Sequence, residues 1–174
     1  MALAWSGSRL TRLTLGHPSA ASAIASLEAD DAWVETSSDD SPAWIADLVG
    51  RLQSFAAGND EQFADVPLDL SHLSDFQGRV VRACRRIQRG RVRTYGELAA
   101  AAGASGAARA VGSVMAKNRF PIIIPCHRVV ASNSLGGFTA RDGLNLKQRM
   151  LELEGVTMKK RSRQPRSLPL SSGW

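Results

Sequence analysis

Charge is distributed very unevenly along the 174 residues of this chain, and the division predicts two parts with different tasks. Residues 1–75 hold three basic and twelve acidic residues, a net charge of −9, whereas residues 76–174 hold nineteen basic and four acidic residues, a net charge of +15. A part this basic suits a polyanion such as nucleic acid, because each phosphate contact releases condensed counterions; a solvated basic face is the alternative. The acidic part would repel a phosphate backbone, so we expect any nucleic-acid contact in the second part.

Composition places the chain among folded proteins, since 44% of its residues are hydrophobic and 22% are charged. The length allows one compact domain or two small ones. No stretch approaches the roughly 18 to 20 apolar residues of a membrane span, and the N-terminus lacks the pattern of a secretory signal. We therefore expect a cytoplasmic protein, or a nuclear one if the source is eukaryotic, with no membrane partner. Two cysteines are too few for a disulfide framework, and no metal site is expected.

The first part carries one hairpin pattern and one helix pattern. The stretch ALAW-SGSR-LTRLTLG alternates apolar and polar residues around a Ser-Gly turn, which is typical of a β-hairpin. Residues 42–57 space their apolar side chains as a helix does, at Ile45, Leu48, Leu52 and Phe55. Residues 67–70 read as a short extended linker. This linker and the switch in charge predict a domain boundary near residue 70.

The second part begins with a well-marked helix. Ser74 and Gln77 form a capping-box pattern, and Gly90 is expected to end the helix. Cys84 falls on the apolar face of this helix, with Phe76, Val80 and Ile87. We therefore interpret Cys84 as an inert thiol of the core.

Two short helices follow around a tight glycine-containing turn, the pattern of a helix-turn-helix. Thr94 and Glu97 form a capping box for the first of them, which should stop at Gly103, and Ser105 is expected to cap the second. The second helix presents small side chains rather than base-reading ones, with Arg109 as its one long projecting residue. Such a face could approach a narrow minor groove closely, but ordinary helix packing also favours Ala and Gly, and the sequence leaves both readings open.

A candidate reactive thiol follows an apolar run. Residues 120–124 are predicted to form a buried strand that leads directly into Pro125-Cys126-His127-Arg128. The attacking species of a cysteine is the thiolate, and a neighbouring imidazole and nearby arginine charge would both favour ionisation. A histidine that acts as a base also needs an orienting acceptor, most simply a carboxylate. The alternative is a buried thiol that serves only the core beside a structural histidine.

These motifs together resemble a known family. IPCHRVV, preceded by AARAVGSVMAKN and followed by GGFTARDGLNLKQRMLELEG, is similar to the O6-alkylguanine-DNA alkyltransferases, or methylated-DNA–protein-cysteine methyltransferases. The similarity is close from about residue 76 to residue 155 and loose before it, where the chain matches the family's first domain after its first strand. Two departures stand out: Arg119 lies where the family commonly has proline, and FTARDGL is longer than the shortest family version.

The resemblance implies a role for individual side chains. Cys126 would accept the alkyl group, His127 would generate the thiolate through a bridging water, and Glu154 would orient His127. Asn118 would brace the active-site turn, and Tyr95 would protonate the departing guanine. The other expected site residues are Arg109, as a wedge in the base stack, with Tyr95, Thr94, Ala107, Ala108, Gly112, Ser113 and Arg128 for DNA binding, and Phe138, Thr139 and Pro125 for the substrate pocket.

The expected fold class is α/β (α+β). By resemblance, residues 1–70 form a small ribonuclease-H-like N-terminal domain, and residues 71–155 form a mostly helical winged helix-turn-helix domain that binds DNA and accepts the alkyl group. Residues 156–174 are expected to be a disordered basic tail. The tail either adds phosphate contacts or is simply solvated.

The expected function is the direct reversal of DNA damage. A monomer without metal or cofactor would bind double-stranded DNA through the minor groove, flip out O6-alkylguanine (or O4-alkylthymine) and move the alkyl group to Cys126 once. One alternative is a lesion-binding damage sensor that transfers nothing. Another is a thiol hydrolase that uses Cys126 and His127, for which the basic part has no evident purpose.

Overall fold

The computed structural model describes residues 1–28, 40–140 and 142–157, so most of the expected basic tail lies outside the described residues. The elements in chain order are β1 (Ala2–Ser6), β2 (Arg9–Thr14), α1 (Ala20–Glu28), α2 (Ala43–Ala56), α3 (Asp75–Arg85), β3 (Arg93–Thr94), α4 (Tyr95–Ala101), α5 (Ala108–Ala116), the 3-10 turn η2 (Cys126–Arg128), β4 (Val129–Val130) and α6 (Gly143–Leu153). This mixture of helices and small sheets confirms the expected α+β class.

The expected N-terminal hairpin and helix are both present. Strands β1 and β2 pair antiparallel, with a bulge between Ala4 and Trp5, and Gly7 adopts the positive φ of 56° that their tight turn requires. Helix α1 packs on this hairpin. Helix α2 covers residues 43–56 and buries the four predicted apolar residues, Ile45, Leu48, Leu52 and Phe55.

The extended segment before residue 70 is hydrogen-bonded to both parts of the chain, so it is more than a flexible linker between them. Leu10 of β2 donates its backbone N–H to Pro67 O (2.9 Å) and accepts from Asp69 N (2.8 Å). Arg85 of α3 donates to the carbonyl oxygens of Phe63, Ala64 and Val66. One cluster of buried apolar side chains runs across residue 70, from Leu10 on the hairpin to Met150 on α6. The domain boundary expected there stays a prediction.

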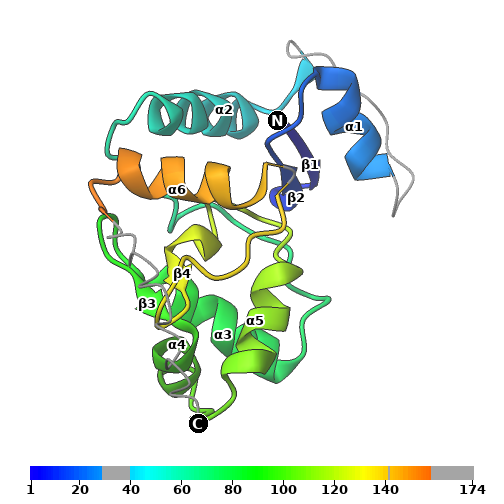
Figure 1. Ribbon diagram of the computed structural model, residues 1–174. Coiled ribbons are helices and arrows are strands. Elements are labelled where there is room, and N and C mark those ends of the chain that lie inside the picture. Colours follow the sequence, from blue (N-terminus) through cyan, green and yellow to red (C-terminus); the bar gives the residue numbers. More distant parts are fainter. Residues whose placement is uncertain (29–39, 141, 158–174) are drawn as a thin grey trace, which may run out of the picture.

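The second part contains the predicted helix-turn-helix, although two helix ends differ from the expectation. Helices α3, α4 and α5 pack together at one end of the molecule (Figure 1). Both capping boxes, Ser74 with Gln77 and Thr94 with Glu97, are formed. Helix α3 stops at Arg85 rather than continuing to Gly90. Helix α5 starts at Ala108 with no side-chain cap, so the cap expected from Ser105 is wrong.

The strand predicted at residues 120–124 is also wrong. The run is buried at Phe120, Ile123 and Ile124, but it folds back as a turn in which Ile124 N donates to Phe120 O (2.8 Å) and Ile122 has a φ of 75°. A side-chain amide takes the place of a neighbouring strand: Asn118 accepts from Phe120 N (3.0 Å) and donates to Ile124 O (2.9 Å). The apolar pattern therefore predicted burial correctly but not the backbone conformation.

A short parallel ladder fixes the position of Tyr95 relative to Cys126. Strand β3 pairs with β4 in the register Arg93 with Val129 and Thr94 with Val130. Because β3 leads directly into α4 and β4 follows η2, the ladder places the start of α4 beside the turn that carries Cys126.

Among the described residues, no helix is long and apolar enough to cross a membrane.

Candidate active site around Cys126

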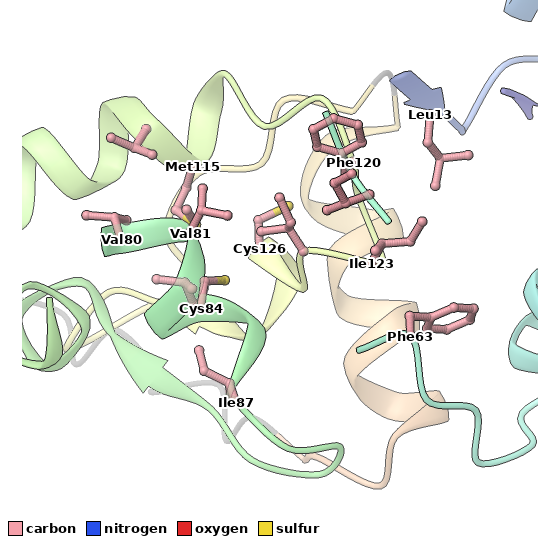
Figure 2. Packing of buried hydrophobic residues seen from close by; sticks show 14 of the residues in the cluster. Leu13, Phe63, Val80, Val81, Cys84, Ile87, Met115, Phe120, Ile123 and Cys126 are labelled. Atoms are coloured by element: carbon pink, nitrogen blue, oxygen red, sulfur yellow. The ribbon is translucent and has the colours of Figure 1, made fainter. Parts of the chain in front are cut away.

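The thiol of Cys126 lies on the buried turn formed by residues 117–128, the active-site turn, within the apolar core but in contact with two cavities. Cys126 is 8% exposed and lies among Val81, Met115 and Ile123 of the buried cluster (Figure 2). Two cavities reach it, one of about 430 Å³ and one of about 70 Å³. Cys84 is completely buried nearby, and burial raises the pKa of this thiol well above its usual value, as expected of an inert core residue.

Asn118 holds the turn and the thiol at once. Besides its two bonds to the turn backbone, its Nδ2 lies 3.1 Å from Cys126 Sγ and can donate to it. Burial raises the pKa of Cys126, and the bond from Asn118 and the positive charge of Lys147 act in the opposite direction. The thiol is therefore mainly protonated at neutral pH, with two groups placed to stabilise its thiolate.

His127, Glu154 and Arg128 form a buried cluster beside the thiol. His127 is fully buried, and its Nε2 lies 2.9 Å from Glu154 Oε1. Arg128 donates from Nε and Nη2 to the same carboxylate, at 2.8–3.2 Å, and from Nη1 to Ile87 O (2.6 Å). Because helix α6 ends next to Glu154, the cluster also ties the end of α6 to the active-site turn.

The protonation states in this cluster follow from burial and hydrogen bonding. Burial lowers the pKa of His127, although Glu154 works in the opposite direction, so the imidazole is neutral at pH 7. Burial alone would raise the pKa of Glu154, but the bonds from His127 and Arg128 outweigh it and lower the pKa to about 2. A neutral His127 that donates from Nε2 to this carboxylate has its lone pair on Nδ1. That buried atom has no hydrogen-bond partner among the residues described.

Arg128 is placed differently from the expectation. We expected it to contact DNA, but its side chain is 11% exposed and its guanidinium is bound to Glu154 and Ile87. The physical reason is that Glu154 is a buried negative charge. Neutral His127 cannot balance that charge, so the carboxylate needs the positive charge of Arg128. Arg128 is therefore used inside the protein rather than presented to DNA.

Lys147 is a site residue that the sequence reasoning missed. It is fully buried on α6, and its Nζ donates to Val129 O (2.5 Å) and Gly137 O (3.2 Å). Burial lowers its pKa to about 8. A signal was present in the sequence: Lys147, Met150, Leu151 and Glu154 follow the spacing of one helix face, so a charged residue at each end of an apolar stripe indicates a buried polar site.

Tyr95 and the loop at residues 136–139 enclose the smaller cavity. The Tyr95 hydroxyl donates to Gly137 O (3.4 Å), and burial raises the pKa of Tyr95, which keeps the phenol protonated at neutral pH. Gly136 packs against this ring so closely that a Cβ atom there would lie 2.8 Å from it. Thr139 donates to Ala116 O (3.1 Å). The loop is thus held against α5 and Tyr95 together.

The remaining expected residues divide between the cavities and the surface. Phe138 and Thr139 line both cavities that reach Cys126, whereas Pro121 rather than Pro125 lines the larger one. Pro125 precedes η2 instead. The expected DNA-binding residues of the helix-turn-helix lie on α5 and at the two helix starts, with Arg109 and Ser113 exposed, Gly112 facing Tyr95, and Ala107, Ala108 and Thr94 half-buried. No group of three or more described His, Cys, Asp or Glu side chains is placed to hold a metal ion.

The Glu154 cluster predicts a specific dependence of stability on pH. The folded pKa is depressed, so the stabilising contribution of Glu154 is complete above about pH 5 and is lost as the pH falls through about 2. Glu154→Gln should lower the free energy of unfolding by about 3–5 kcal/mol at pH 7, because Arg128 loses its buried counter-charge. Urea unfolding followed at several pH values should show this difference shrinking below about pH 4. Glu152→Gln, at an exposed position on α6, is the control and should change stability by less than about 0.5 kcal/mol. A constant difference between pH 7 and pH 2.5 would contradict this reading.

The Asn118 contact predicts a change in thiol reactivity. Asn118→Ala should slow the alkylation of Cys126 by iodoacetamide at pH 7 by roughly 10-fold or more, because a hydrogen bond to a charged group is worth about 1.5–3 kcal/mol. The midpoint of the pH–rate profile should move upward. Mass spectrometry of the labelled peptides separates Cys126 from Cys84, and Asn145→Ala, at an exposed position, is the control. An unchanged midpoint would show that Asn118 does not act on the thiolate.

Known proteins are similar to this chain in sequence and in fold. Residues 75–156 match the family model described as the DNA-binding domain of 6-O-methylguanine DNA methyltransferase. The chain is 41% identical over 160 residues to the methylated-DNA–protein-cysteine methyltransferase of Mycobacterium tuberculosis, covering 91% of each chain. It is also 41% identical over 112 residues to the enzyme of that name from Metallosphaera sedula, covering 64% of this chain and 69% of the other.

Solved structures agree with these sequence matches. The crystal structure of the Mycobacterium tuberculosis O6-methylguanine methyltransferase superposes with a TM-score of 0.68 at 37% identity, covering 95% of this chain and 88% of the other. The structure of Mycobacterium tuberculosis OGT in complex with DNA gives a TM-score of 0.67 at 38% identity, covering 88% and 85%. The chain therefore belongs to the methylated-DNA–protein-cysteine methyltransferase family.

Proposed function

We propose that this protein repairs O6-alkylguanine in DNA by transferring the alkyl group to its own Cys126. The observation that carries the proposal is the thiol itself: Cys126 lies at a cavity, receives a hydrogen bond from Asn118, and is followed directly by the buried His127–Glu154 pair. The M. tuberculosis relative, which bears the name of this activity, matches over 91% of the chain.

The thiol proton leaves through His127. Neutral His127 donates from Nε2 to Glu154, which leaves Nδ1 as the acceptor, and a single water between Nδ1 and the thiol would satisfy this otherwise unpaired buried atom. As the imidazole becomes cationic, the Glu154 carboxylate stabilises it. Arg128 keeps that carboxylate ionised and fixed in position. Glu154 and Arg128 therefore act on the thiol through His127.

The thiolate is stabilised by groups that are in place before the substrate arrives. Asn118 donates a hydrogen bond to the sulfur, and the Lys147 ammonium lowers the pKa of Cys126 through its charge. Both are fixed by backbone contacts, Asn118 to the turn and Lys147 to Val129 and Gly137. Such fixed groups need no rearrangement when the charge develops.

Transfer is a single in-line displacement. The sulfur forms a bond to the alkyl carbon as the carbon–O6 bond breaks, and the electron pair passes to the guanine. Tyr95, protonated and beside the smaller cavity, donates a proton to guanine N3 so that a neutral base departs. The net change is one S–C bond formed and one C–O bond broken. The thiol proton passes to His127 and the base takes its proton from Tyr95, so the imidazolium afterwards releases a proton to solvent and the phenolate takes one up from solvent. A thioether is not readily reversed, so each molecule acts once, without a cofactor.

DNA binding falls to the basic second part of the chain. Exposed Arg109 on α5 can enter the base stack from the minor groove, because the neighbouring small side chains let the helix approach closely. The lesion must be flipped out, since a stacked guanine cannot reach a thiol that is 8% exposed. O4-alkylthymine presents the same alkyl–oxygen bond and is a second substrate. The protein acts as a monomer on double-stranded DNA.

Transfer can be read directly from the mass of the protein. After incubation with a duplex that contains one O6-methylguanine, the intact mass should rise by one methylene unit, confined to the Cys126 peptide and limited to one equivalent. Cys126→Ala should abolish the gain and leave duplex binding largely intact, and Cys84→Ala is the control that should still transfer. Tight binding without a change in mass would instead identify a damage sensor, and multiple-turnover ester hydrolysis would identify a thiol hydrolase.

The wedge role predicts an effect that depends on the duplex. Arg109→Ala should slow transfer from O6-methylguanine in duplex DNA by roughly 10-fold or more, because the flipped state loses its replacement in the stack. Reaction with free O6-benzylguanine should change by less than about twofold, since no base is flipped. Arg93→Ala, on β3, removes the same charge from an exposed position outside α5 and is the control. Equal losses on both substrates would count against the wedge.

A further inference from the structure

The two cavities that reach Cys126 differ in size and in charge. They share Met115, Ala116, Phe138 and Thr139, so they meet at the thiol. The smaller one, beside Tyr95, is the side on which the proposed mechanism places guanine. The larger one, of about 430 Å³, extends away from Tyr95 towards the N-terminal hairpin. A methyl group transferred to Cys126 would not need this second space.

The wall of the larger cavity is cationic and comes from both parts of the chain. Strand β2 contributes Arg12, Leu13 and Thr14, and the active-site turn contributes Lys117 and Arg119 on either side of Asn118. Leu13 N donates to Arg119 O (2.8 Å), which fixes the hairpin against the turn. No carboxylate is among the described residues that line this cavity. Lys117 is exposed and Arg119 half-buried, so the positive charge lies towards the opening.

The geometry of displacement determines what this space receives. The sulfur, the attacked carbon and O6 lie on one line in the transition state, so any substituent on that carbon must project sideways from the line. With guanine in the smaller cavity, the free volume beside the thiol is the larger cavity. A substituent longer than methyl therefore extends between β2 and the active-site turn.

We propose that the larger cavity is a subsite for the substituent on the O6 carbon, and that Lys117 and Arg119 favour a substituent that ends in a carboxylate, such as carboxymethyl. This inference rests on the proposed function. A carboxylate that leaves water needs a compensating cation, which these side chains supply, whereas a neutral carbamoyl group can accept a hydrogen bond from them but forms no ion pair. Arg119 also lies where the family commonly has proline, so this charge departs from the common pattern.

A DNA phosphate shares the chemistry of such a carboxylate, and the experiment must separate the two anions. Single-turnover rates are measured on one duplex sequence that carries O6-methylguanine, O6-carboxymethylguanine or its neutral isostere O6-carbamoylmethylguanine. The diagnostic quantity is the ratio of the carboxymethyl rate to the carbamoylmethyl rate. Comparing this ratio between protein variants cancels both the intrinsic reactivity of the two lesions and any shared loss of duplex binding.

Lys117→Gln with Arg119→Gln should lower the ratio by roughly tenfold, the loss expected from two partly exposed charge contacts. Lys117→Gln alone, at an exposed position, should lower it by roughly threefold and covers the case in which the double variant is poorly folded. Arg86→Gln with Arg149→Gln removes the same charge from exposed positions outside the cavity and should leave the ratio unchanged.

Three other outcomes would contradict this proposal, each in a different way. An unchanged ratio, with all three rates lowered together and a weaker salt dependence of duplex binding, would show that these cations contact phosphate and not the substituent. An equally lowered ratio in the Arg86/Arg149 variant would show a general effect of net charge. No transfer from O6-methylguanine by the unchanged protein would overturn the proposed function itself.

Discussion

The buried carboxylate of Glu154 is the interaction on which the rest of the site depends. A fully buried carboxylate is costly unless it is paired and hydrogen-bonded, and here Arg128 and His127 both donate hydrogen bonds to it. The same contacts fix the end of α6 to η2, orient the imidazole, and leave His127 neutral with its Nδ1 lone pair available. Stability and chemistry are therefore set by one cluster: removing the carboxylate would leave Arg128 unpaired and His127 unoriented.

The active-site turn depends in the same way on one amide. Asn118 satisfies two backbone groups of residues 120–124 that a strand would have paired with a neighbour, and its remaining donor proton is directed at Cys126 Sγ. The backbone can then adopt a tight turn with positive φ at Ile122, a conformation that a β-branched residue rarely takes. A turn held by its own side chain can present a thiol at a cavity, which a continuous strand in the core could not do.

The two parts of the chain meet at the site rather than apart from it. Strand β2 is joined to residues 67–69 on one side and to Arg119 on the other, so the hairpin forms a wall of the larger cavity. The acidic first part thus shapes the cavity next to the thiol, even though its negative charge would repel a phosphate backbone. Beside the smaller cavity, Lys147 connects two segments in a similar way: its Nζ donates to β4 and to the loop that encloses that cavity.

The sequence by itself determined the features that depend on local physics. Both capping boxes, the hairpin around Gly7, the apolar face of α2 and the inert position of Cys84 follow from residue type and spacing, because near neighbours in the chain satisfy them. The pairing of a candidate reactive Cys126 with His127 was read from the sequence itself, whereas the role of Glu154 came from motif resemblance. Only the tertiary structure decided that residues 120–124 turn back, that Arg128 faces Glu154 and that Lys147 is buried near Cys126. Each of these depends on partners 18 to 41 residues away or on a side chain replacing a strand, and no local pattern encodes such contacts.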